Sequence, residues 1–274
     1  MNENGEPERY RAPALDKGLD ILEVLATSES GMSQAEIAKA LGRSPNEIYR
    51  MLDRLVRRDY VLRTAEDRYT LTLKLFELAH STPPLRRLAV QAMPVMREFA
   101  LLTEQSCHLV VYDRGAVVIA QVDSPGYWSV AIRVGARVGL VDTGSGHVLL
   151  AFAPAEERRL MLTEHDIAVP QDFETRLAEI RDRGYERMRS LQIPGVTNLS
   201  CPILGPAGSV IAVLTCPFTQ RLDKPDAPDE PATLKHLRSA CAEISRRPGI
   251  EHRDDAAGRS SQPSRRKSLA ETSP

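Results

Sequence analysis

Residues 33–55, SQAEIAKALGRSPNEIYRMLDRL, are the stretch that decides the fold of the first part of this chain. Ser33 and Glu36 form the S-x-x-E pattern of a capping box, which predicts the start of a helix. Gly42 predicts the end of that helix, because glycine adopts the left-handed backbone conformation at low cost. Ser44-Pro45 predicts a second helix start, since serine is a favoured N-cap and proline is tolerated in the first turn. Two helices joined by a short turn are therefore expected.

The segments on either side of this stretch complete a small domain. Upstream, leucines at helical spacing predict an amphipathic helix; they are Leu15, Leu19, Leu22 and Leu25. Downstream, residues 60–63 and 68–71 are strand-like runs around a turn at 64–67, which predicts a β-hairpin. Helix, helix, turn, helix and hairpin is the order of a winged helix-turn-helix, which is assigned to residues 13–71.

A second, larger domain is expected over residues 85–247, after a linker helix at 72–84 that breaks at Pro83-Pro84. It opens with a long helix at 85–102, which Pro94 is expected to disturb. The predicted strands cover 107–112, 117–122, 129–134, 138–141, 196–204 and 209–216, and the later helices cover 144–152, 154–163, 172–183 and 232–246. Neighbouring hairpins with helices at their ends predict an antiparallel α+β domain.

The two ends of the chain, 1–12 and 248–274, are poor in large apolar residues and are predicted to be disordered. No apolar run approaches the roughly 18 residues that a membrane span needs, and the first residues lack a signal peptide's features. A cytoplasmic location without membrane contact is therefore expected. The four cysteines form no C-x-x-C pair, which predicts buried thiols and no zinc site. Neither a metal nor a cofactor is expected.

The net charge of −1 does not by itself indicate a nucleic-acid partner, so DNA binding has to come from local placement. In a helix-turn-helix, the second helix of the motif inserts its N-terminal part into the major groove. Asn46 and Arg50 lie on this part, and their side chains suit adenine and guanine edges. The predicted DNA-binding residues are Ser33, Gln34, Arg43, Ser44, Asn46, Tyr49, Arg50 and Arg68. The alternatives are a solvated face and a surface for protein contacts.

One helix start in the second domain has the composition of an anion-binding site. Thr143 can cap this helix, and the N–H groups of Gly144, Ser145 and Gly146 then lie at its positive end. The small side chains let a ligand approach the backbone closely. A small organic acid or a polar aromatic molecule is therefore the expected ligand, with Ser145 as a hydrogen-bonding partner.

Enzyme interpretations of the same domain are weaker. The motif Asp-Thr-Gly-Ser at 142–145 occurs in aspartic proteases, but that chemistry needs two carboxylates and the chain has no second copy. Ser145 and His147 are two residues apart on a predicted helix, so their side chains point in different directions. Cys107 and His108 leave a strand on opposite faces, and His108 is interpreted as a core or surface residue, with a pocket wall as the alternative. No catalytic residue is assigned, and a sensor-type enzyme remains the alternative function.

The chain resembles the IclR family of bacterial transcriptional regulators over about residues 13–245. In the first domain the resemblance rests on LDKGLDIL at 15–22, QAEIAKALG at 34–42, IYRMLDRL at 48–55, and YTLT at 69–72 followed by Leu75. In the second it rests on RVGAR at 133–137, TGSGHVLLA at 143–151, IRDRGY at 180–185, and residues 195–202. The resemblance implies a GAF-like effector domain after the winged helix-turn-helix, homodimers that can pair into tetramers, and ligand control of DNA binding.

The family's pattern also implies the ligand contacts. They fall at Gly144, Ser145, Met188 and Asn198, with an apolar wall of Tyr127, Trp128 and Val130. This chain departs from the pattern at three positions, because His147 stands where a lysine is common, Met188 where an acid is frequent, and Asn198 where a cysteine is frequent. The implied function is a ligand-responsive regulator that binds paired half-sites of double-stranded DNA and controls a catabolic operon, with repression favoured over activation.

Overall fold

The computed structural model describes residues 12–80, 83–164, 169–205 and 208–247. The chain divides into two compact units, residues 1–82 and 83–274. The predictions of disorder for the two ends fall on residues outside the described ranges, apart from Ala12. Among the helices that the structure describes, none is long and apolar enough to cross a lipid bilayer.

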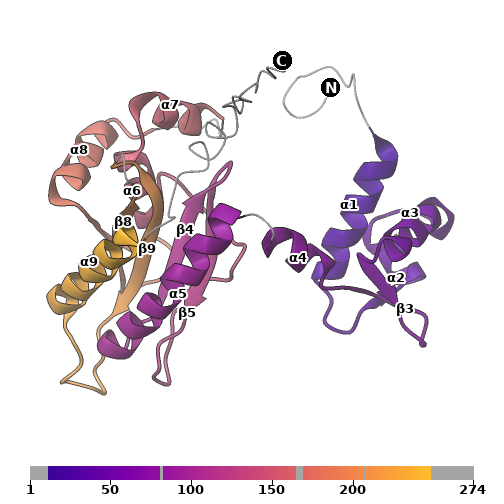
Figure 1. Cartoon of the computed structure of the whole chain (residues 1–274), viewed down its shortest axis with the longest axis horizontal. Helices are drawn as coiled ribbons and strands as arrows, with labels where there is room; N and C mark the ends of the chain where they lie inside the picture. The colour runs from indigo at the N-terminus through magenta and orange to yellow at the C-terminus, as the bar shows by residue number, and fades with distance from the viewer. Residues whose placement is uncertain (1–11, 81–82, 165–168, 206–207, 248–274) are drawn as a thin grey trace, which may run out of the picture. The chain divides into compact units, whose positions relative to one another are not determined.

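The first unit contains the predicted helices and hairpin (Figure 1). Its elements are α1 (Pro13–Ala26), β1 (Met32–Ser33), α2 (Gln34–Ala40), α3 (Pro45–Arg57), β2 (Val61–Arg63), β3 (Arg68–Leu71) and α4 (Lys74–His80). The strands form a sheet in the order β1-β3-β2. The short strand β1 pairs with β3, with Met32 opposite Tyr69. The sequence did not predict this strand. The winged helix-turn-helix order is confirmed.

Capping residues place the two helices of the motif. The Glu36 N–H donates to the Ser33 hydroxyl and the Ser33 N–H donates to the Glu36 carboxylate, so the predicted capping box is present. Gly42 follows α2 with a φ of +61°, the left-handed conformation expected at a helix end. The Gln34 amide donates to the Pro45 carbonyl at 2.9 Å, which ties the start of α2 to the start of α3.

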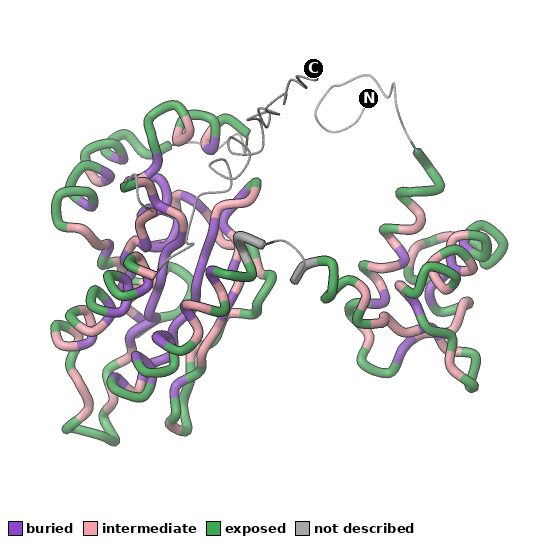
Figure 2. Tube along the Cα trace, viewed as in Figure 1, coloured by how far each residue is buried: buried purple, intermediate pink, exposed green. Residues whose placement is uncertain are grey.

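A small apolar core holds the first unit together, as the buried stretches in Figure 2 show. Its fully buried members are Ile21, Leu25, Ile37, Ala38, Ile48, Leu52, Val61 and Tyr69. Ile48 and Leu52 bring one face of α3 into this core, so the opposite face of the helix is exposed to solvent.

The second unit is a six-stranded antiparallel sheet with helices packed on both faces (Figure 1). Its elements are α5 (Pro83–Thr103), β4 (Cys107–Tyr112), β5 (Ala116–Val122), β6 (Arg137–Val138), α6 (Gly144–Phe152), α7 (Ala155–Thr163), α8 (Phe173–Arg183), β7 (Glu186–Arg189), β8 (Val196–Leu204), β9 (Val210–Thr219) and α9 (Glu230–Arg246). The strand order is β6-β5-β4-β9-β8-β7. The predicted α+β class is therefore confirmed.

Alternation along the strands separates the two faces of this sheet. On β8, Leu199, Cys201 and Ile203 join a core with α5 and α9, and all four cysteines are buried there as free thiols. Asn198 and Ser200, which alternate with these residues along β8, lie on the opposite face, beside the start of α6. This second face combines an apolar core under α6 and α8 with a strip of polar side chains.

One prediction about the second unit is wrong, and one strand was not predicted. Residues 129–134 form no strand, because they are held mainly by side chains, with the Ser106 hydroxyl donating to the Val130 carbonyl and the Gln121 amide oxygen accepting from the Ile132 N–H. Strand β7 was not predicted, since its sequence Glu-Arg-Met-Arg has no apolar alternation. Pro94 lies inside α5, and the helix continues through it to Thr103.

Candidate functional site

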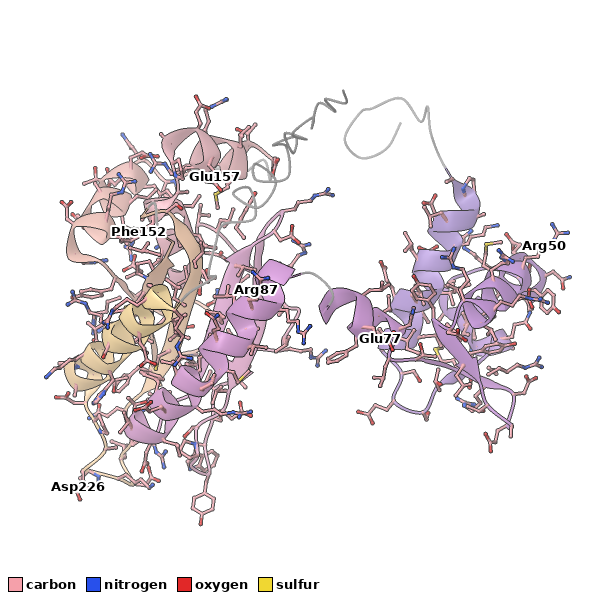
Figure 3. The ribbon with its side chains drawn as sticks, in the orientation of Figure 1. Arg50, Glu77, Arg87, Phe152, Glu157 and Asp226 are labelled. Atoms are coloured by element: carbon pink, nitrogen blue, oxygen red, sulfur yellow. The ribbon has the colours of Figure 1, made fainter. Side chains whose placement is uncertain are left out.

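The exposed face of α3 is the first candidate surface. Asn46, Tyr49 and Arg50 lie on it, near the N-terminal end of the helix, and Tyr49 is 57% exposed. Figure 3 shows Arg50 pointing away from the body of the first unit. Within the described part of the chain, the side chains of Asn46 and Arg50 form no ion pair or hydrogen bond with the protein. Both are therefore available to an external partner.

The other predicted DNA-binding residues have contacts within the first unit. Arg43 pairs with Asp20 at 3.2 Å. Arg68 donates to the Gly31 carbonyl at 2.7 Å and pairs with Glu36 at 3.2 Å, so it braces the wing against α2. These arginines have structural contacts in this unit, since Arg68 donates to Gly31 and pairs with Glu36, and one guanidinium nitrogen of Arg43 pairs with Asp20.

The two predicted capping serines are also engaged. The N–H and the hydroxyl of Ser44 donate to the Glu47 carboxylate at 2.9 and 2.8 Å. Hydrogen bonds from Ser44 lower the pKa of Glu47, and those from Ser33 lower the pKa of Glu36, so both helix starts hold an ionised carboxylate of their own. A phosphate group would meet these carboxylates at the starts of α2 and α3. The face of α3 that presents Tyr49 and Arg50 is the more open surface.

The second candidate is a cavity of about 370 Å³ in the second unit, at the start of α6. Its walls come from α6, from the polar strip of β4, β8 and β9, and from the segments before and after these elements. Of the predicted ligand contacts, Val130, Gly144, Ser145 and Asn198 line it.

The start of α6 presents two open backbone donors to this cavity. Thr143 caps the helix by accepting from the Gly146 N–H at 3.1 Å, so Gly146 is not a free donor as predicted. The N–H groups of Gly144 and Ser145 have no acceptor among the residues that the structure describes. A side chain at Gly144 would place its Cβ 2.8 Å from the Ser200 hydroxyl, so glycine is needed for this close packing.

Polar groups on the sheet lie directly under this helix start. The Ser145 hydroxyl is 2.9 Å from the Thr215 hydroxyl, which donates to Ser200 at 2.8 Å. All three side chains are buried. These three hydroxyl groups bond to one another. Asn198 and His108 are further polar side chains of the cavity wall.

His108 lines the pocket, a location that the sequence analysis gave only as an alternative to the core or the surface. Its side chain lines the cavity, is almost fully buried, and has a ring nitrogen, Nδ1, with no hydrogen-bond partner in the described structure. Burial lowers the pKa of His108 to about 4. The sequence could not choose between core and pocket for this residue, because the choice depends on which strands flank β4.

The cavity also contains one charge of each sign. Arg137, whose guanidinium donates to the Arg114 carbonyl at 2.7 Å, lies on its wall, as does Asp142. Neither residue was predicted as a ligand contact. Arg137 is on β6, a strand of two residues that has no clear sequence signature.

Three predicted ligand residues do not line the cavity. Tyr127 and Trp128 are 96% and 75% exposed on the segment after β5, so they form no apolar wall in this structure. They lie outside because residues 129–134 do not pair as a strand that would carry them onto the sheet. Met188 pairs with Asn198 on the neighbouring strand and is half-buried beyond the cavity lining.

A buried ion cluster lies next to the cavity and joins α6, α8 and β7. The carboxylate of Glu186 is fully buried and accepts from His147 at 3.0 Å, Arg176 at 3.0 Å and Arg183 at 2.7 Å. Burial by itself raises the pKa of Glu186, but the hydrogen bond from His147 and the charges of the two arginines outweigh it and lower that pKa. Glu186 was missed because β7 was missed.

The contacts of this cluster also argue against a Ser145–His147 catalytic dyad. The two ring nitrogens of His147 face Glu186 and the Val141 carbonyl, at 3.0 and 2.9 Å. The Ser145 hydroxyl instead bonds to Thr215. His147 and Ser145 therefore have separate partners, as their spacing on the helix predicts.

Comparisons with known proteins match both parts of the chain to the same family. The model of the IclR helix-turn-helix domain matches residues 14–65, and the model of the bacterial transcriptional regulator IclR C-terminal region matches residues 85–246. The HTH-type transcriptional regulator KdgR of Escherichia coli (strain K12) is 30% identical over 212 residues, which are 74% of this chain and 80% of that protein.

Solved structures share the fold. Pseudomonas aeruginosa HmgR has a TM-score of 0.67 and 26% identity, and the match covers 85% of this chain and 97% of that chain. An IclR homologue from Microbacterium hydrocarbonoxydans, complexed with 4-hydroxybenzoate, has a TM-score of 0.71 and 22% identity, over 86% and 98% of the two chains. Because the family matches span both units, this chain belongs to the IclR family and is a DNA-binding, ligand-responsive transcriptional regulator.

Proposed function

We propose that this regulator binds operator DNA through α3 and that a small organic acid in the cavity at the start of α6 controls the binding. The observation that carries the effector class is the pair of N–H groups on Gly144 and Ser145, which have no acceptor among the described residues. Such donors at the positive end of a helix suit a carboxylate. The cavity volume is in the range of small-molecule sites.

The same class includes polar aromatic acids. The related structure complexed with 4-hydroxybenzoate is one protein of this fold with such a compound. In the present chain, Val130, Ile132 and Val138 supply apolar wall next to the polar strip, which suits the carbon skeleton of an acid.

The DNA-binding form is proposed to be a homodimer or a dimer of dimers in the cytoplasm. A winged helix reads one half-site, so two copies are needed for paired half-sites in double-stranded DNA. On α1, Leu15 and Leu19 are 61% and 48% exposed and lie one turn apart, which supports an apolar contact with another copy.

The sign of control is proposed to be repression of a catabolic operon. An acid that binds better to the conformation with low DNA affinity releases the operator, and it can shift the equilibrium only by this difference in affinity. An acidic substrate of the controlled enzymes would then induce them.

The test is a mobility-shift assay with DNA from upstream of the gene, combined with titration calorimetry of the free protein against small carboxylic acids. We expect site-specific DNA binding that at least one acid weakens tenfold or more. Specific DNA binding that responds only to sugars or to cationic compounds would overturn the effector class while leaving the DNA-binding role in place.

A further inference from the structure

The inference concerns the unsatisfied ring of His108 and rests on the proposed function. His108 lies on β4, directly opposite Thr215 of β9 and Gln121 of β5. Only 2% of its surface is exposed, and Nδ1 has no partner within the described residues. A buried polar atom left without a hydrogen bond costs about 1–3 kcal/mol. A ligand in the cavity is one way to recover that cost.

The neighbours of His108 on the two flanking strands do not satisfy the ring, because their polar groups bond to other residues. The Thr215 hydroxyl bonds to Ser145 and Ser200. The Gln121 amide nitrogen donates to the Val122 carbonyl and to Asp123, while its oxygen accepts from the Ile132 N–H. The cavity is the remaining direction in which His108 can find a partner.

The ring is uncharged at neutral pH, since burial lowers the pKa of His108 to about 4. A neutral imidazole has one N–H donor and one acceptor nitrogen. A second carboxylate on the ligand would find no positive charge here and would have to be desolvated at high cost. A hydroxyl group, which both donates and accepts, matches either tautomer of the ring.

The charges around the start of α6 favour a single carboxylate. The open N–H groups of Gly144 and Ser145 give the helix start a partial positive charge. Arg137 and Asp142 lie on the same cavity and have opposite formal charges. The positive helix start can therefore balance one carboxylate of a ligand, but not a second one.

We propose that His108 binds a hydroxyl group of the effector, so that the pocket selects monocarboxylic acids that carry a hydroxyl group over their deoxy analogues and over dicarboxylic acids. The carboxylate binds at the start of α6, and the hydroxyl binds at the imidazole on β4. His108 is thus a specificity-determining residue of this chain.

The test is titration calorimetry of the full-length protein with matched probes. The pairs are 4-hydroxybenzoate against benzoate and lactate against propionate, with terephthalate as the dicarboxylic acid. We expect the hydroxylated member of the binding pair to bind about tenfold tighter in the wild type, the order of one net hydrogen bond. Terephthalate should bind more weakly than 4-hydroxybenzoate.

Variants assign this preference to the ring. His108→Phe keeps an aromatic ring without nitrogen and should reduce the preference to less than about twofold. His108→Gln restores a donor and an acceptor and should recover part of it. His236→Phe, on α9 and outside the cavity lining, is the matched control and should behave as the wild type. Circular dichroism melting checks that each variant is folded.

The outcomes separate this inference from the proposed function. If carboxylic acids bind the wild type but hydroxylated and deoxy probes bind equally, or if His108→Phe keeps the preference, the role of His108 is wrong and the acid pocket stands. If none of the probes binds and none displaces DNA, the proposed effector class fails, and the role of His108 fails with it.

Discussion

Single side chains decide which part of each unit is open to a partner. On α3, Asn46 and Arg50 are available, whereas Arg43 and Arg68 are held by Asp20 and Glu36. The sequence predicted DNA contacts for all three arginines, because residue type and spacing do not show which acceptor each guanidinium group has in the folded unit. Arg50 is therefore the residue whose replacement best tests specific DNA binding.

Replacing Arg50 by alanine should weaken site-specific DNA binding by about 5–100-fold, since one base-edge contact contributes roughly 1–3 kcal/mol. The melting temperature should not change, because the side chain has no hydrogen-bond or ion-pair partner among residues 12–80. Mobility shifts of specific and non-specific DNA measure the effect. Arg97→Ala, an exposed arginine on α5, is the matched control. Unchanged specific affinity in Arg50→Ala would exclude α3 as the reading helix.

His108 makes a prediction about stability against pH. Its pKa is about 4 in the folded protein and 6.5 is its ordinary value, so between these values the unfolded chain binds a proton that the folded chain does not. The free energy of unfolding is therefore complete above pH 6.5 and falls with acidification, by about 2 kcal/mol from this residue between pH 7 and pH 5.

The measurement is urea unfolding of the wild type and His108→Phe at several pH values between 7 and 5. The wild type should lose about 2 kcal/mol more than the variant over this window, and His236→Phe should keep the wild-type slope. Parallel slopes for wild type and His108→Phe would mean that the ring is not buried as a neutral group.

At the scale of elements, the start of α6 depends on two glycines with different surroundings. A Cβ on Gly146 would lie 2.4 Å from the carbonyl oxygens of Gly139 and Leu140, which are backbone atoms that cannot turn aside. A Cβ on Gly144 would meet the Ser200 hydroxyl at 2.8 Å, and that group can rotate at the loss of its hydrogen bond.

Gly146→Ala should thus destabilise the second unit by about 3 kcal/mol, and Gly144→Ala by about 1–2 kcal/mol with loss of acid binding. Gly18→Ala on α1 is the control, since no atom lies within 4 Å of its added Cβ and helix propensity favours alanine. Urea unfolding and calorimetry measure the two effects. Equal destabilisation by the two α6 variants would contradict the contacts described.

The Glu186 cluster joins three elements that are separate in the sequence. Its carboxylate contacts His147 of α6 and Arg176 and Arg183 of α8, while Glu186 itself begins β7. Because its pKa is lowered, the ionised carboxylate stabilises the folded state above pH 4.5, and this contribution is lost as the pH falls below that value.

We expect Glu186→Gln to lower the free energy of unfolding by about 3 kcal/mol at pH 7, because the cations lose their buried counterion. Thermal and urea unfolding measure it, with Glu98→Gln on the exposed side of α5 as the control. The acid probes should also bind more weakly, since the cluster anchors α6 beside the pocket. A variant as stable as the wild type would show that the cluster has no net stabilising role.

At the scale of the whole molecule, binding of acid and binding of DNA are assigned to different units. The cavity lining lies entirely within residues 83–274. Expressed alone, this unit should bind the same acid probe with an affinity within about threefold of the full chain and should not bind DNA. Calorimetry measures this, and loss of acid binding in the folded fragment would mean that the first unit contributes to the site.

The sequence by itself determined the elements whose signals are local. Ser33 with Glu36, Ser44 with Pro45, and Thr143 before Gly144 mark helix starts that the structure confirms, because capping involves residues within one turn. The strands predicted at 107–112 and 196–204 likewise coincide with β4 and β8. These features were sufficient for the α+β class and the order of the two domains.

Only the tertiary structure decided the composition of the pocket. His108, Ser145 and Thr215 meet because β4 and β9 are neighbours in the sheet and α6 crosses above them, although the residues lie far apart in the chain. Tyr127 and Trp128 were expected in the wall and lie outside it, since residues 129–134 are held by side-chain hydrogen bonds and not by a ladder. Contacts between distant segments depend on strand register and packing, which no local pattern specifies.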